Sequence, residues 1–67
     1  MMKPITPEMA KRQSMVSVTS PYLRTETDML EKAVAQFVGC NIALVETGHG
    51  IEIWRVKSEV KEVKNGN

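Results

Sequence analysis

The chain has 67 residues, with nine basic and eight acidic side chains that give a formal net charge of +1. This length fits one domain, and a domain of this size buries only about 60% of the surface that its unfolded chain exposes. One cysteine and one histidine exclude an intrachain disulfide and are too few for a protein zinc site. We therefore expect a second copy of the chain to supply the missing stability, as a homodimer without metal or cofactor.

The hydropathy of the chain predicts no association with a membrane. No apolar run approaches the roughly 18 residues that a spanning helix needs. Met1–Pro4 begins with two methionines, a lysine and a proline, and no apolar segment of the signal-peptide type follows. With its single cysteine, the chain is expected in a reducing, cytoplasmic compartment.

Residues 1–13 are expected to form an N-terminal arm, either flexible or holding one short helix. Thr6 is suited to cap a helix and Pro7 to occupy its first position, which predicts a helix over Pro7–Gln13. Its apolar side chains are Met9 and Ala10, too few to hold it without tertiary contacts. For that reason a mobile arm is favoured, because termini without buried anchors are usually mobile, and the short helix is the alternative.

Ser14–Ser20 is predicted to be a short, half-buried strand. Val16 and Val18 alternate with small hydroxyl side chains, which is the period of a strand. Pro21 ends it, because proline has no N–H to donate to a neighbouring strand.

The strongest helix signal lies over Thr25–Val38. Thr25 and Asp28 have the spacing of a capping box, and Gly39 can take the left-handed conformation that closes a helix. The apolar side chains repeat at helical period along one face, namely Leu30, Ala33, Val34, Phe37 and Val38.

Cys40–Val56 is predicted to be a β-hairpin with its turn at Thr47–Gly50. An even register pairs Glu46 with Ile51, Leu44 with Ile53 and Ile42 with Arg55. A register shifted by one residue would place Glu46 opposite Glu52, which like-charge repulsion disfavours. Glycine at position 48 suits the first central position of a type II′ turn.

This register gives the hairpin two apolar faces, and one helix can cover only one of them. The face expected to pack on the helix carries Ile42, Leu44, Ile51 and Ile53. The other, called here the Trp54 face, carries Ala43, Val45, Trp54 and Val56, with Asn41 and Glu52 beside them. A second copy, a different protein, or the termini of the chain, through Met9 and Met15, could cover it. Aromatic residues are enriched at interfaces, so these four residues are our interface candidates.

The predicted architecture is a two-layer α+β domain over residues 14–58, in the order β-α-β-β. One helix packs on a small antiparallel or mixed sheet built around the C-terminal hairpin. Beyond Val56 the strand continues to about Ser58, or Val60 and Val63 form a helical turn. Residues 59–67 are expected to be a polar tail with a disordered end.

We find no set of residues typical of catalysis. Cys40 and His49 are the natural nucleophile and base, but six strand steps put roughly 20 Å between them. Glu26, Asp28 and Glu31 are explained by the positive end of the helix dipole. The glycines around His49 join two strands, whereas a phosphate-binding loop precedes a helix. Cys40 is expected to be a small buried hydrophobe and His49 an exposed turn residue.

The sequence therefore favours a non-enzymatic protein-interaction module that forms a homodimer. One alternative is a regulator that contacts nucleic acid through a basic arm or a sheet edge, with Lys3, Lys11, Arg12 and Arg24 as the contacts. Another, suggested by size alone, is an accessory protein of the phage or mobile-element type that modulates a host protein.

Overall fold

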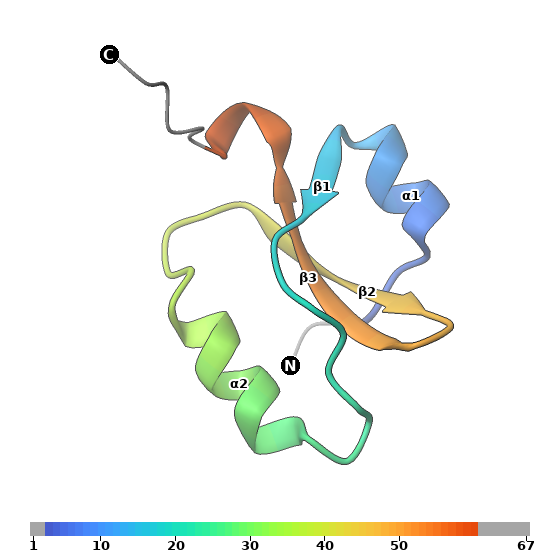
Figure 1. Ribbon diagram of the computed structural model, residues 1–67. Helices are drawn as coiled ribbons and strands as arrows, with labels where there is room; N and C mark the ends of the chain where they lie inside the picture. Colours follow the sequence, from blue (N-terminus) through green and yellow to red (C-terminus); the bar gives the residue numbers. More distant parts are fainter. Residues whose placement is uncertain (1–2, 61–67) are drawn as a thin grey trace, which may run out of the picture.

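The computed structural model describes residues 3–60 and shows a small α+β domain, as the sequence predicts (Figure 1). The predicted C-terminal turn at Val63 and the disordered end lie outside the described residues. The elements, in chain order, are α1 (Pro7–Arg12), β1 (Met15–Ser17), α2 (Thr27–Ala35), β2 (Ile42–Thr47), β3 (Gly50–Val56) and the single 3-10 turn η1 (Lys57–Glu59).

The three strands form one antiparallel sheet in the order β1-β3-β2, with β3 in the centre. The hairpin register is confirmed, because Glu46 pairs with Ile51 and Leu44 with Ile53. On the other side of β3, Val16 pairs with Arg55. Of the three described strands, the last in the sequence therefore lies between the first two.

Helix α2 packs on the face predicted for it. Leu30 and Ala33 are buried against Leu44 and Ile53, and Ile42, Ile51 and Phe37 pack around them. The helix is shorter than Thr25–Val38, and Val38, expected on the buried face, is 85% exposed. The α-helix ends at Ala35, and a turn then leads to Gly39, whose φ of 84° is the expected left-handed conformation.

The start of α2 differs from the predicted capping box. Its N-cap is Glu26, not Thr25, and no side chain caps the first turn. Glu26 instead reaches backwards, and its Oε1 accepts a hydrogen bond of 2.7 Å from the N–H of Leu23. The longer glutamate side chain thereby fixes the turn that precedes the helix.

Strand β1 is shorter than Ser14–Ser20 because Thr19 bonds to β3 through its side chain and not through its backbone. The N–H of Val18 still donates to the carbonyl of Ile53. The N–H of Ile53, however, donates to Oγ1 of Thr19 at 3.0 Å. The chain bends there and returns to the sheet at Tyr22, which exchanges two hydrogen bonds of 2.8 Å with Ile51.

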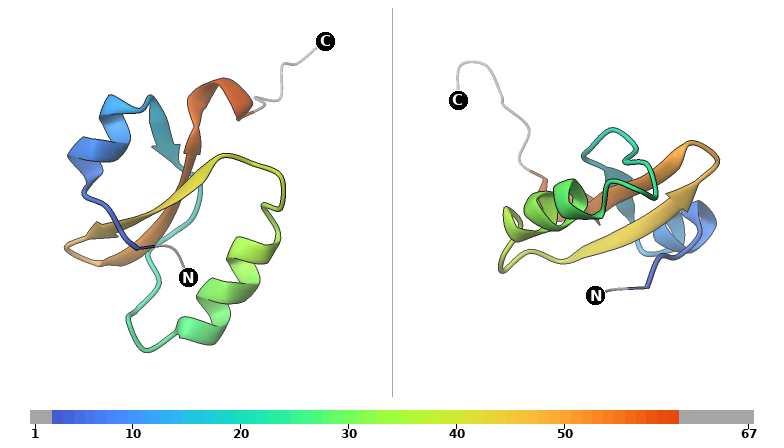
Figure 2. Two further views of the ribbon diagram at one scale, coloured as in Figure 1. Left: turned by 180° about the vertical axis from the view of Figure 1, so that it is seen from behind. Right: turned by 90° about the horizontal axis from the view of Figure 1, so that it is seen from below.

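The predicted two-layer arrangement is not confirmed, because α1 packs on the sheet as well. Successive strand residues point to opposite faces, and α1 contacts Val45 and Trp54 whereas α2 contacts Leu44 and Ile53. The sheet therefore lies between two helices, which Figure 2 shows on different sides of the hairpin. The order β-α-β-β is contained in the fold but lacks this first helix.

Candidate functional site

The Trp54 face is covered in the structure by the N-terminal arm. Val45 is fully buried, Trp54 is 8% exposed, and Ala43 and Val56 are half-buried. Ala10 of α1 and Met15 of β1 pack against them, with Ile5 at the margin. Of the three covers considered from the sequence, the structure has the N-terminal arm of the chain itself in this place.

Trp54 has the polar contact that a buried indole needs. Its Nε1–H donates to Oε1 of Glu52 at 2.8 Å. The two residues are two positions apart on one strand, so their side chains point to the same face. The ring therefore fills the core under α1 while its N–H stays paired, as is usual for buried tryptophan.

The arm is fixed to the domain at its beginning by a short stretch of strand pairing. Ile5 lies parallel to β2, where its N–H donates to the carbonyl of Leu44 and its carbonyl accepts from the N–H of Glu46. Thr6 then caps α1 by accepting a hydrogen bond of 3.2 Å from the N–H of Met9, as predicted. The helix is the ordered form of the two that the sequence allows.

The side chains that cover the Trp54 face differ in part from those expected. Met15 is buried, but Met9 is 45% exposed, and Ala10 takes the place expected for it. Alanine gives a weak hydrophobic signal in a sequence, because its side chain is a single methyl group. That small size is what lets the backbone of α1 approach Val45 and Trp54. Ile5 could have been found from sequence as the one branched aliphatic residue of the arm.

The connection from α1 to β1 is short and has an unusual backbone conformation. Ser14 has a φ of 60°, a left-handed value, and its N–H donates to the carbonyl of Lys11. Its carbonyl accepts a hydrogen bond of 2.7 Å from Lys57, which ties the start of β1 to the end of β3. Among the residues that the structure describes, Ser14 is the one non-glycine residue with positive φ.

The four basic residues proposed as nucleic-acid contacts do not form one surface. Lys11 and Arg12 end α1, next to the Ser14–Lys57 contact. Arg24 follows Tyr22, which pairs near the opposite end of β3, so about 20 Å of strand separates the two groups. The guanidinium of Arg24 is paired with Glu46. Lys3 lies in the segment that approaches β2.

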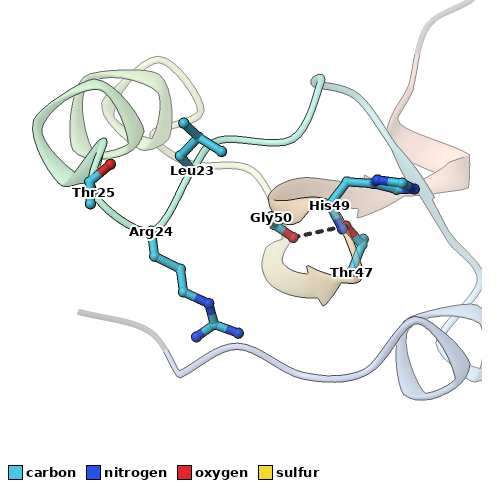
Figure 3. Close-up of a pocket in the computed structure, with 7 residues that line it drawn as sticks. Leu23, Arg24, Thr25, Thr47, His49 and Gly50 are labelled. Carbon is cyan, nitrogen blue, oxygen red and sulfur yellow. Dashed lines mark hydrogen bonds between the residues drawn. The ribbon is translucent and has the colours of Figure 1, made fainter.

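A groove of about 370 Å³ lies between the Leu23–Thr25 connection and the hairpin turn. Thr47 organises the turn, because its Oγ1 accepts from the N–H of His49 and donates to the carbonyl of Gly50. The side chains of Arg24 and His49 do not point toward one another (Figure 3). His49 is exposed, as predicted.

Cys40 and His49 lie at opposite ends of β2, as the hairpin predicts, and Cys40 is half-buried where full burial was expected. Within residues 3–60, no cluster of three potential metal ligands occurs. In the same part of the chain, no helix is long and apolar enough to cross a membrane.

Comparison with protein-family models, with curated proteins and with solved structures finds no match to this chain.

Proposed function

We propose that the chain is a small protein-interaction module that acts by binding, and that it associates with a second copy of itself through the Trp54 face. The observation that supports this most is the nature of the cover. The described part of the arm contributes one fully buried side chain, Ala10, with Ile5 half-buried beside it. An apolar surface covered by so little side chain can become available for association.

The arm is also weak as an independent element. Helix α1 has six residues, and an isolated helix of that length does not persist in water. Its position depends on the contacts of Ala10 and on two hydrogen bonds at Ile5. Opening the arm therefore costs little compared with unfolding the sheet, and local opening of this kind is common at chain termini.

Because Trp54 is buried, it is a poor position for a substitution that tests this proposal. Replacing Trp54 by alanine would remove core packing worth about 3–5 kcal/mol, and loss of the fold would be mistaken for loss of binding. Ala43 is a better position, because it is half-buried at the margin of the face. Met29 on α2 is 54% exposed and belongs to the other side of the sheet, so it provides the matched control.

We expect sedimentation equilibrium to show a mass that rises from the 7.5 kDa of one chain to twice that value with concentration. Ala43→Gln should increase the quenching of Trp54 fluorescence by acrylamide, because Ala43 pairs with Trp54 and a longer polar side chain at the margin of the face opposes its burial. Met29→Gln should leave it unchanged. A wild-type chain that stays a monomer at every concentration would contradict the proposal.

A further inference from the structure

One connection, at Gln13 and Ser14, joins the arm to the part of the domain on which the arm packs. Within residues 3–60, and apart from bonds inside the arm and the bond from the Ser14 N–H to Lys11, the residues that α1 and Ile5 pack against or bond to come after Ser14: Met15, Ala43, Leu44, Val45, Glu46, Trp54 and Val56. An identical surface exists on every other copy of the protein. The arm of one chain can therefore make the same set of contacts on a second chain, with no new complementarity required.

The connection favours such an exchange. Gln13 and Ser14 reverse the chain between α1 and β1, and the reversal requires the left-handed φ of 60° at Ser14. Serine has a Cβ, which makes this conformation unfavourable relative to extended backbone. In an opened connection Ser14 can adopt an extended φ and continue the direction of β1. Short, strained connections of this kind are those that promote exchange of segments between chains.

We infer that the homodimer forms by exchange of the N-terminal arm, so that α1 and Ile5 of each chain occupy the Trp54 face of the partner. This rests on the proposed function, since it specifies how the self-association occurs. The closed chain and the exchanged dimer share every contact of the arm and differ at Ser14. The closed form is favoured by dilution and the exchanged form by concentration and by the strain at Ser14.

A pair of substitutions at Ser14 tests the connection directly. Glycine accepts positive φ without a Cβ clash, so Ser14→Gly should favour the closed monomer. Valine is β-branched and is strongly disfavoured at positive φ, so Ser14→Val should favour the dimer. We expect the dimer dissociation constant of Ser14→Val to be at least about tenfold lower than that of Ser14→Gly. Ser20→Val, at an exposed position without positive φ, is the control and should match the wild type.

A disulfide trap distinguishes exchange from ordinary docking of two closed chains. Ile5 and Val45 are paired across the arm and β2. In a Cys40→Ser background, which removes the one native cysteine, Ile5→Cys with Val45→Cys should form a disulfide between chains if the arm is exchanged. Oxidised protein should then run as a covalent dimer under denaturing, non-reducing conditions. Circular dichroism before oxidation checks that the variant is folded, and the Ser14 series decides if it is not.

The outcomes separate this inference from the function on which it rests. A wild-type chain that stays monomeric at every concentration overturns both. A wild-type dimer whose dissociation constant is the same in Ser14→Gly and Ser14→Val overturns arm exchange and leaves self-association standing. An intrachain disulfide in a dimeric Ile5→Cys, Val45→Cys variant does the same. Arm exchange is supported if the dimer dissociation constant rises in Ser14→Gly and falls in Ser14→Val, and if the disulfide forms between chains.

Discussion

Gly50 is the residue at which the structure tolerates no side chain. Its φ is 139°, and a Cβ built on it would lie 2.4 Å from the carbonyl oxygen of Tyr22. That carbonyl accepts the N–H of Ile51, so it cannot move without breaking the contact between the Tyr22 connection and β3. Gly48, in the same turn, has nothing within 4 Å of such a Cβ and no positive φ.

We expect Gly50→Ala to lower the free energy of unfolding by about 1–3 kcal/mol, because it adds both backbone strain and a collision with backbone. Gly48→Ala should change it by less than about 1 kcal/mol. Urea denaturation of the two variants measures both values. Equal losses would show that the turn, and not the contact with Tyr22, sets the requirement for glycine.

The turn lies where the sequence predicts it, but the glycine with positive φ is Gly50 and not Gly48. The four residues Thr47–Gly50 and the avoidance of a Glu46–Glu52 pair were enough to fix the register. A type II′ turn would require positive φ at Gly48, and the structure has it at Gly50 instead. The reason is a long-range one: Tyr22 approaches Gly50 from 28 positions earlier in the chain. No local pattern reports such a contact.

At the scale of elements, the docking of α1 can be followed through Trp54, the one tryptophan of the chain. The indole lies in the cluster that contains Ala10, so its surroundings depend on the position of the helix. Ala10→Gln should undock α1, because a long polar side chain cannot be buried there without a partner. The fluorescence maximum should shift to longer wavelength, and acrylamide should quench Trp54 more strongly.

Met9→Gln provides the matched control for this experiment, because Met9 belongs to the same helix but is 45% exposed. Its spectrum should resemble the wild type. Equal shifts in the two variants would indicate that general loss of helicity, and not the burial of Ala10, controls the environment of Trp54.

Both helices show what local sequence can and cannot decide. Thr6 and Pro7 predicted where α1 begins, because capping is a local interaction. Docking of the arm was one of three covers that the sequence allows, but through Met9, whereas the structure buries Ala10, since alanine carries little periodic signal. For α2 the apolar spacing gave the correct face but extended it to Val38, which the structure leaves 85% exposed. Periodicity identifies a face, whereas the point where the helix leaves the sheet depends on the whole fold.

For the whole molecule, the proposed exchange of arms would link folding to concentration. A chain of 67 residues has a small core, and the cluster formed by the Trp54 face with Ala10 and Met15 holds four of the eight buried residues in its described part. If that half is completed by a partner, unfolding separates the copies. We expect the thermal midpoint measured by far-ultraviolet circular dichroism to rise with protein concentration. The midpoint followed through Trp54 fluorescence should rise with it, and a midpoint independent of concentration would contradict the linkage.

The order of the strands in the sheet could not be predicted from the sequence. The hairpin was predictable because β2 and β3 are adjacent in the chain. The place of β1 beside β3 was not, because it depends on the path of the chain around α2 and on the Ser14–Lys57 and Thr19–Ile53 contacts. The same limit applied to charge, since residues grouped as one basic arm proved to occupy both ends of the sheet.

The pairing of Ile5 with β2 also has a consequence for solubility. Strand β2 is at the edge of the sheet, and an unpaired edge can template the stacking of further strands into fibrils. Ile5 occupies the carbonyl of Leu44 and the N–H of Glu46 on that edge. Pro4, directly before it, has no N–H to offer to another chain. The arm therefore also protects the edge of β2 from pairing with other chains. When the arm opens, that edge stays unpaired until another segment binds to it.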